Sequence, residues 1–340
     1  MLHILLTGAG FSYNWGGYLA KEAFDYLLGV TEHDEDLRRV LWADQARGVG
    51  FETTLARLRK AYEENYSPQF EQDLQNMTTA VRRMFGDMWL AFGQTPFDEK
   101  SDNPRLGIIR FLTRFDAIFT LNQDTLLETH YLPVVRQEDF AKNTYQGPRN
   151  MGADRPGLVP ALDSLTFGSE ASRIPLFKVG DDFSGIPYTQ PYYKLHGSID
   201  IQDGRNMMLI LGGDKEADIA KYPLLEAYHE QFRSRLNMKG ARLMIIGYSF
   251  ADGHINKMIF DAIENSGLKI FLVGPDGATT IGANKSFPLN PGPQIKNAIV
   301  GASSRPLRNT LSGRDMVELT KIERFFQDGR MAFTYQNPPL

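Results

Sequence analysis

Short apolar segments that end in glycine or polar residues recur along this chain, and stretches with helical periodicity separate them. Each segment has the length of one buried strand, and the intervening stretches carry apolar residues three or four positions apart. The predicted strands are residues 2–7, 115–121, 192–195, 207–211, 242–247 and 269–274. Alternating strands and helices favour an α/β fold whose parallel sheet is covered on both faces. We therefore predict a doubly wound parallel sheet.

Four helices are predicted between the first strand and residue 97, the first of them over 16–28. The others, over 34–47, 51–64 and 69–92, form a helical insertion at about 30–100, closed by a polar linker over 97–104. Further helices are predicted over 103–113, 221–238, 254–265 and 314–327, and long loops over 140–187. We expect one domain over 1–290 that contains the insertion, and a C-terminal extension over 291–340.

The composition excludes several classes of protein. The 340 residues include no cysteine, which excludes disulfides, thiolate nucleophiles and cysteine-ligated metals. The net charge of −4 gives no reason to expect direct nucleic-acid binding. We expect no signal peptide, because the N-terminus lacks a basic stretch followed by a long apolar run, and no apolar segment approaches the roughly 20 residues that span a bilayer. We expect a cytoplasmic protein that does not bind membranes.

The first predicted strand ends in GAGFS, residues 8–12. Gly8 and Gly10 would allow backbone N–H groups to face an anion, so this turn suits a phosphate cradle. The dinucleotide fingerprint has a third glycine where this chain has Tyr13, and no second strand follows within about 30 residues. An ordinary tight turn between a strand and a helix is the alternative explanation.

Polar side chains also follow two later strands. Asn122 and Asp124 come just after residues 115–121. The amide can hold a water or a sugar hydroxyl, and the carboxylate can accept hydrogen bonds from a ribose, although helix capping is the alternative role. His196 follows residues 192–195 beside a glycine, where a general base could reach a substrate. A purely structural histidine is the alternative there.

The strand over 242–247 leads into GYSFADGHIN, residues 247–256. This turn can receive the adenosine half of a dinucleotide, and a helix N-cap at Asp252 is the alternative. None of the six histidines pair at a metal-ligand spacing such as H-E-x-x-H, so we expect no metal site. Because the carboxyl ends of parallel strands meet at one edge, these motifs should form a single site.

In this order, the motifs resemble the sirtuin family, in particular its bacterial branch without the zinc ribbon. The matching segments are GAGFS (8–12), TLNQD (120–124), HG (196–197), GYS (247–249) and VGP (273–275). The resemblance covers roughly residues 1–20 and 105–275. Deacylating sirtuins have four zinc-binding cysteines, a glutamine where this chain has Leu121, and a Pro-Asp-Phe-Arg segment after the glycine-rich loop. These departures argue against binding of an acyl-lysine peptide. Among sirtuin-like proteins, the chain instead resembles the NAD-hydrolysing effectors of bacterial antiphage defence.

The resemblance implies a Rossmann-like NAD-binding domain and an NAD+ glycohydrolase that releases nicotinamide and ADP-ribose. Asn122 and His196 would be the catalytic residues, with NAD as the substrate and no metal. The residues that would contact NAD are Gly8, Ala9, Gly10, Ser12, Asp124, Gly247, Ser249, Asp252 and Asn256. Two alternatives stay open: a non-catalytic sensor of NAD or ADP-ribose that controls a partner, and a zinc-free protein deacylase.

An unrestrained NAD hydrolase would deplete the cofactor of its own cell, so its activity must be controlled. The chain has no P-loop and no basic stretch that would sense nucleic acid. We therefore expect control by assembly, by another protein or by a small ligand. The apolar stripes of the insertion suggest a homo-oligomer, or alternatively a lid on a monomer. By resemblance to sirtuin-like defence systems, a separately encoded ATPase such as a hexameric DNA translocase is the expected partner.

Overall fold

The computed structural model describes residues 1–48, 50–99, 106–133, 135, 147–150, 177–178, 189–203, 206–210, 212–283 and 293–327. The strands are β1 (Leu2–Thr7), β2 (Ala117–Thr120), β3 (Pro148–Asn150), β4 (Phe177–Lys178), β5 (Gln190–Lys194), β6 (Gly197–Asp203), β7 (Asn206–Leu209), β8 (Ala241–Ile246), β9 (Lys269–Val273) and β10 (Ile299–Ser303). The helices before β8 are α1 (Ala9–Tyr13), α2 (Ala20–Val30), α3 (Glu35–Ala46), α4 (Phe51–Glu64), α5 (Pro68–Gln94), α6 (Ile108–Leu112), α7 (Leu126–His130), α8 (Lys215–Ile219) and α9 (Pro223–Leu236). The later helices are α10 (Gly253–Ser266), η3 (Gly277–Thr279), α11 (Thr280–Ala283), α12 (Pro293–Ala298), α13 (Leu307–Leu311), α14 (Met316–Glu323) and η4 (Arg324–Phe326).

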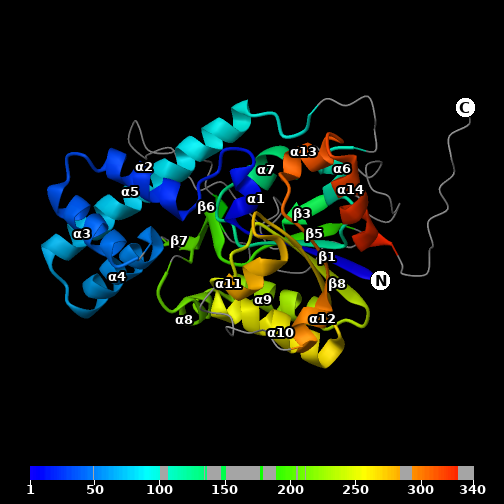
Figure 1. Cartoon of the computed structure of the whole chain (residues 1–340). Coiled ribbons are helices and arrows are strands. Elements are labelled where there is room, and N and C mark those ends of the chain that lie inside the picture. The colour runs from blue at the N-terminus through cyan, green and yellow to red at the C-terminus, as the bar shows by residue number, and fades with distance from the viewer. Residues whose placement is uncertain are drawn as a thin grey trace, which may run out of the picture.

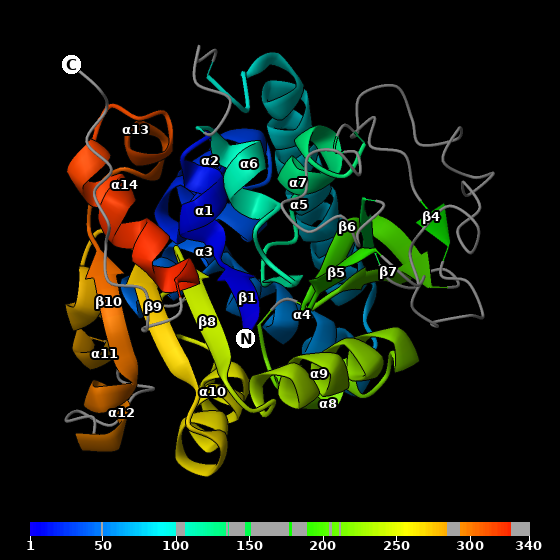
Figure 2. The same ribbon diagram turned by 90° about the vertical axis from the view of Figure 1, so that its right-hand side faces the viewer.

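Seven of the described strands form one parallel sheet in the order β10-β9-β8-β1-β2-β5-β3 (Figure 2). Near its centre, Thr7 of β1 is in register with Thr120 of β2 on one side and with Ile246 of β8 on the other. The chain builds outward from β1 through β2 and β5, and later crosses back to add β8, β9 and β10. The winding therefore reverses between β1 and β8, where doubly wound sheets bind their ligands. The predicted fold class is confirmed.

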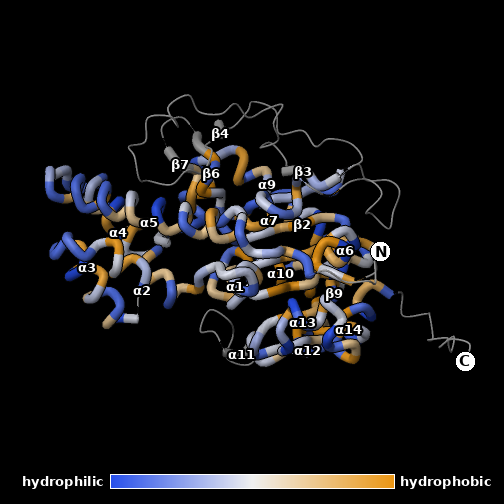
Figure 3. Tube along the Cα trace, turned by 90° about the horizontal axis from the view of Figure 1, so that it is seen from above, coloured by the Kyte–Doolittle hydropathy of each residue, from blue (hydrophilic) through white to orange (hydrophobic). Residues whose placement is uncertain are grey.

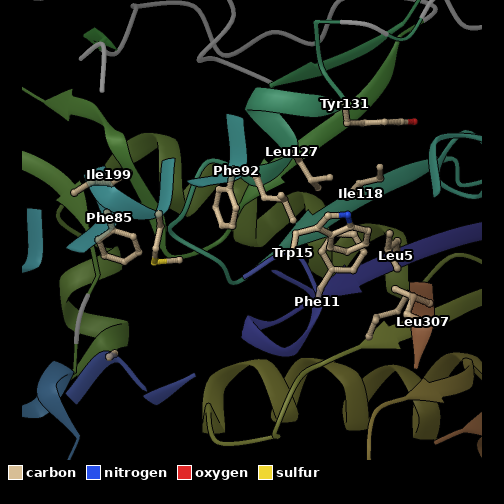
Figure 4. Packing of buried hydrophobic residues seen from close by; sticks show 14 of the residues in the cluster. Leu5, Phe11, Trp15, Phe85, Phe92, Ile118, Leu127, Tyr131, Ile199 and Leu307 are labelled. Atoms are coloured by element: carbon tan, nitrogen blue, oxygen red, sulfur yellow. The ribbon is translucent and has the colours of Figure 1, made fainter. Parts of the chain in front are cut away.

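The sheet has an apolar core on each face, because successive strand residues point to opposite sides. Leu5 and Ile118 face a core shared with α2–α7, α13 and α14, whereas Ile4 and Phe119 face a core shared with α9, α10 and α12. All four side chains are fully buried. Figure 4 shows Phe11, which follows β1, packed beside Leu5 in the first of these cores. Both sides of the sheet are therefore covered, as the apolar strands require.

Helices α2–α5 project to one side of the sheet, and α5 runs back toward α7 (Figure 1). The apolar stripes of these helices face one another, so that Leu37, Leu55 and Met77 are all buried. Trp42 of α3 is an exception, with 53% of its surface exposed. Hydrophilic residues cover much of the outer side of these helices (Figure 3). No described helix combines the length and the apolar character that crossing a membrane requires.

Several elements differ from the sequence prediction. The helix predicted over 16–28 corresponds to α2, which begins only at Ala20. A short helix that was not predicted, α1, precedes it, and Gly16, with φ of +91°, lies between the two. β3, β4, β6 and β10 were not predicted, and β3 and β4 lie within the stretch predicted as loops over 140–187. In β10 (IVGAS) only two large apolar residues precede Gly-Ala-Ser, which is too short an apolar run to indicate a strand. β10 joins the main sheet, so part of the predicted C-terminal extension shares that sheet. Most of the predicted 140–187 loops and the predicted start of the 103–113 helix lie outside the described residues.

Candidate functional site

The predicted site residues gather beyond the carboxyl ends of neighbouring strands. Thr7, Thr120 and Lys194 are register partners at the ends of β1, β2 and β5. The Thr7 hydroxyl donates a 2.8 Å hydrogen bond to Thr120 Oγ1, which ties the first two strand ends together. Asn122 and His196 each lie two residues beyond a member of this row. The fold thus brings the two predicted catalytic residues to the same edge of the sheet.

The glycine turns after β1 and β8 pack directly against each other. The N–H of Gly8 donates to the Ile246 carbonyl, and the N–H of Gly10 donates to the Gly247 carbonyl, both at 2.9 Å. A Cβ atom on Gly247, whose φ is +66°, would lie only 2.3 Å from the Phe11 nitrogen. A Cβ atom on Gly10 would lie 2.8 Å from the Gly247 Cα. Close approach of two backbones therefore requires glycine at these positions.

This contact limits how the GAG turn could hold a phosphate. The N–H groups of Gly8 and Gly10 donate to carbonyl oxygens of the protein, so these two groups do not face an anion, and a cradle built from other N–H groups of the turn stays a prediction. The glycines instead allow the turn to seat against the end of β8. Contacts of Gly8, Ala9 and Gly10 with NAD by other atoms stay a prediction.

Ser12 joins the two polar residues that follow β2. The Asn122 side-chain amide donates a 2.8 Å hydrogen bond to Ser12 Oγ, and the Ser12 hydroxyl is also hydrogen-bonded to the Asp124 carboxylate. Asp124 accepts a further bond from the Leu126 N–H at 3.0 Å, so it also caps the start of α7. Burial raises the pKa of Asp124, while Lys194 and these hydrogen bonds favour its charged form. The three predicted site residues Ser12, Asn122 and Asp124 thus form one connected group.

The buried side chain of Lys194 stabilises the loop that follows β2. Lys194 is fully buried, and its ammonium group donates to the main-chain carbonyl of Asp124 and, at 2.8 Å, to Glu128 Oε1. Burial raises the pKa of Glu128 to about 7, with Lys194 opposing this shift and Asp200 adding to it. Tyr192 also donates to Glu128 Oε1, at 3.2 Å. Lys194 therefore fixes the backbone next to the predicted ribose-binding carboxylate.

His196 is held at the end of β5 by the strand that returns beside it. Its carbonyl accepts a 3.0 Å hydrogen bond from the Ile210 N–H. The next residue, Gly197, has φ of +75°, and a Cβ atom there would lie 1.9 Å from the Met208 carbonyl oxygen. Burial, followed by the Lys215 charge and two neighbouring histidines, holds the pKa of His196 well below its usual range. The imidazole is therefore neutral at physiological pH.

The GYSF turn after β8 is maintained by its own side chains. Phe250 has φ of +58°, which is uncommon for a residue with a side chain. Asn256 donates to the Phe250 carbonyl at 2.9 Å and accepts from the Tyr248 hydroxyl at 3.0 Å. Asn256 is 2% exposed, so its amide maintains the turn instead of lining an adenosine site as predicted. Ser249 is exposed, and its contact with NAD stays a prediction.

Asp252 connects the site to the helical insertion. It occupies the N-cap position of α10 but makes no capping hydrogen bond with its side chain. Asp252 Oδ1 instead lies 2.6 Å from Lys215 Nζ, which is also 3.3 Å from Glu52 Oε2 of α4. Burial lowers the pKa of Lys215, but the two carboxylates outweigh it and raise the pKa overall. An ion-pair chain thus runs from the insertion to the loop after β8.

Tertiary structure also assembles a histidine cluster that sequence spacing did not reveal. The Nε2 atoms of His196 and His254 are 3.2 Å apart. With Asp252 they form the one group of possible metal ligands found among the described residues, with ligand atoms within 4.8 Å of one another. His196 follows β5, whereas Asp252 and His254 lie at the start of α10, so no short motif marks all three. The ammonium group of Lys215 already neutralises Asp252, which disfavours a second cation there.

A doubly wound parallel sheet with glycine turns and polar side chains at its switch point defines the class of α/β proteins that bind nucleotides at this edge. Within that class, the family model of the SIR2-like domain matches residues 116–287, about half of the chain, and the chain belongs to this family. The matched segment contains Asn122, His196 and the GYSF turn, whereas the GAG turn precedes it. SIR2-like proteins are usually NAD-dependent enzymes, so membership indicates an NAD-linked activity. Among curated proteins, none matches the chain.

Proposed function

We propose that this protein is an NAD+ glycohydrolase that cleaves the bond between nicotinamide and ribose. The observation that carries the proposal is the placement of Asn122 and His196 beyond the paired ends of β2 and β5 in a SIR2-like chain. One residue offers a neutral amide and the other a neutral imidazole. An amide that holds water and a base that removes its proton are what hydrolysis of this bond needs.

In the proposed reaction, the bond between C1′ of the ribose and the nicotinamide nitrogen breaks, and its electron pair leaves with nicotinamide. Water adds to C1′ and gives its proton to His196, so the products are nicotinamide, ADP-ribose and one proton. The hydrogen bond to Ser12 uses the NH2 group of Asn122. Its Oδ1 atom is therefore the acceptor that would orient the water.

The other site residues have binding roles in this proposal. Asp124 would accept hydrogen bonds from ribose hydroxyls. The turn of Gly8, Ala9, Gly10 and Ser12 would border the pyrophosphate, through atoms other than the two glycine N–H groups already used. Gly247, Ser249 and Asp252 would border the adenosine half, and Asn256 would act indirectly by maintaining the GYSF turn.

We further propose that hydrolysis is gated in the cytoplasm as part of antiphage defence. A homo-oligomer and a separately encoded ATPase, such as a hexameric DNA translocase, are the proposed means of control. The ion-pair chain from Glu52 to Asp252 supports a link between the insertion and the site. Co-expression with the neighbouring open reading frame, followed by NAD measurement during phage infection, tests this gating. Full activity of the isolated chain without harm to growing cells would contradict it.

The hydrolase proposal is tested by incubating the purified protein with NAD+ and measuring free nicotinamide, with and without an acetylated peptide. Asn122→Ala and His196→Ala should each lower turnover by about 10²–10⁴-fold while leaving the fold intact. Asn65→Ala and His33→Ala are matched controls, because both side chains are exposed and far along the chain from the site. Near-normal turnover in either site variant would remove that residue from the mechanism. Binding of NAD+ without nicotinamide release would favour a sensor, and release that depends on the peptide would favour a deacylase.

A further inference from the structure

We propose that His254 is a positioning residue for His196, which holds its ring and determines which ring nitrogen carries the proton. The two Nε2 atoms are 3.2 Å apart, and the ring centroids are 5.3 Å apart. This inference rests on the proposed hydrolase function, because it concerns the general base of that reaction. His254 lies outside the set of residues that the motifs predict.

Two imidazole nitrogens at this distance form a hydrogen bond only when one of them carries a proton and the other does not. If both carried protons, two N–H groups would face each other, and if neither did, two lone pairs would. His196 is 3% exposed, so water does not readily replace this partner. The proton states of the two rings are therefore coupled.

The proposed chemistry selects one of the two arrangements. Nε2 of His196 faces His254, so Nδ1 is the nitrogen left to remove a proton from water. Nδ1 can accept a proton only if it is unprotonated. A neutral imidazole with an unprotonated Nδ1 carries its N–H proton on Nε2. Accordingly, His196 Nε2–H donates to His254 Nε2, and His254 carries its own proton on Nδ1. After His196 takes up the proton, the same hydrogen bond stabilises the imidazolium.

The charges around the pair are compatible with this direction. Burial lowers the pKa of His254, while the carboxylate of Asp252 opposes that shift and makes His254 a better acceptor. Lys215 lowers the pKa of both rings, and Glu216 favours the charged form of His254. The neighbouring His229 of α9 has its Nε2 2.8 Å from the Leu195 carbonyl oxygen, so it donates there.

The first test does not depend on activity. Nitrogen–proton correlation spectra of the full-length protein report the tautomer of each histidine, and His196→Gln identifies the signals of His196. We expect the Nε2–H tautomer for His196 in the wild type. In His254→Ala we expect a mixed tautomer and a lowered pKa of His196, because the imidazolium loses its hydrogen-bond acceptor. An Nδ1–H tautomer in the wild type, or the same spectrum of His196 in the variant, would overturn the proposal.

The second test measures kcat and KM for NAD+ across the pH range in the wild type, His254→Ala and His254→Gln. Loss of the hydrogen bond should lower kcat by about tenfold and shift the acidic limb of the pH profile to lower pH, with little change in KM. The glutamine variant should keep most of the activity, because its amide oxygen accepts from His196 Nε2–H, and it also serves if the alanine variant does not fold. His33→Ala is the matched surface control.

The outcomes of the two tests separate the proposals. Unchanged kcat and pH profile in His254→Ala would overturn the positioning role. Loss of wild-type activity with a chelator and its return with Zn2+ would also overturn it, by making the pair metal ligands. The wild type could release no nicotinamide and still show the Nε2–H tautomer of His196, with that tautomer disturbed in His254→Ala. In that case the hydrolase proposal fails, but the proposal that His254 positions His196 still holds.

Discussion

The main-chain N–H of Gly10 donates a 2.9 Å hydrogen bond to the carbonyl of Gly247, so two turns far apart in the sequence form one packed unit at the switch point of the sheet. Neither turn has room for a side chain at this contact. The geometry of the site therefore depends on backbone packing between β1 and β8 as much as on its polar side chains.

Gly247→Ala should lower the free energy of unfolding by about 2 kcal/mol or more, because it combines a left-handed φ with a Cβ atom 2.3 Å from the Phe11 nitrogen. Gly29→Ala in α2 is the matched control, since a Cβ atom there meets nothing within 4 Å. This control should be neutral or stabilising by about 0.5–1 kcal/mol. Urea denaturation of the two variants makes the comparison, and equal stabilities would contradict the packing argument.

Lys194→Met should destabilise the protein by about 3–5 kcal/mol, because it leaves the buried Glu128 without its ion-pair partner. Adding Glu128→Gln to this variant should recover part of the loss, since the unpaired charge is then absent. A double-mutant cycle in urea measures the coupling. Strict additivity of the two single changes would show that the pair is not coupled.

The protein should lose stability in acid through His229. Burial lowers its pKa from 6.5 to about 4, so between these values the unfolded chain binds more protons than the native protein. The free energy of unfolding therefore falls as the pH drops from about 6.5 to about 4. His229→Gln keeps a donor for the Leu195 carbonyl and should remove about 3 kcal/mol of this loss. Urea denaturation across this pH range should show the difference. The control His33→Gln should show the same pH dependence of the free energy of unfolding as the wild type.

Trp42→Glu should reduce the mass measured by light scattering if the insertion carries the proposed homo-oligomer contact. Trp42 is 53% exposed on α3, whereas Leu37, Leu55 and Met77 of these helices are buried within the chain. Lys239→Glu, which adds negative charge at an exposed position after α9, is the control. A wild type that is monomeric at all concentrations would end this prediction.

Local sequence patterns predict the order of strands and helices in most of the chain. Short apolar runs bounded by glycine indicate buried strands, and they predict the strands over 2–7, 242–247 and 269–274. The polar residues after each strand were visible for the same reason, and a parallel sheet necessarily gathers strand ends at one edge. β10 was missed because its apolar run is only two residues long before Gly-Ala-Ser follows.

The contacts that those residues make depend on the folded arrangement of the strands. Gly8 and Gly10 form a plausible phosphate turn in the sequence, but packing against β8 uses their N–H groups. Asn256 is indistinguishable from a ligand-binding amide until the fold shows that it bonds within its own turn. The pairing of His196 with His254 and the burial of Lys194 likewise join residues from different strand ends. Such contacts depend on how the strands lie in space, and no local pattern records that.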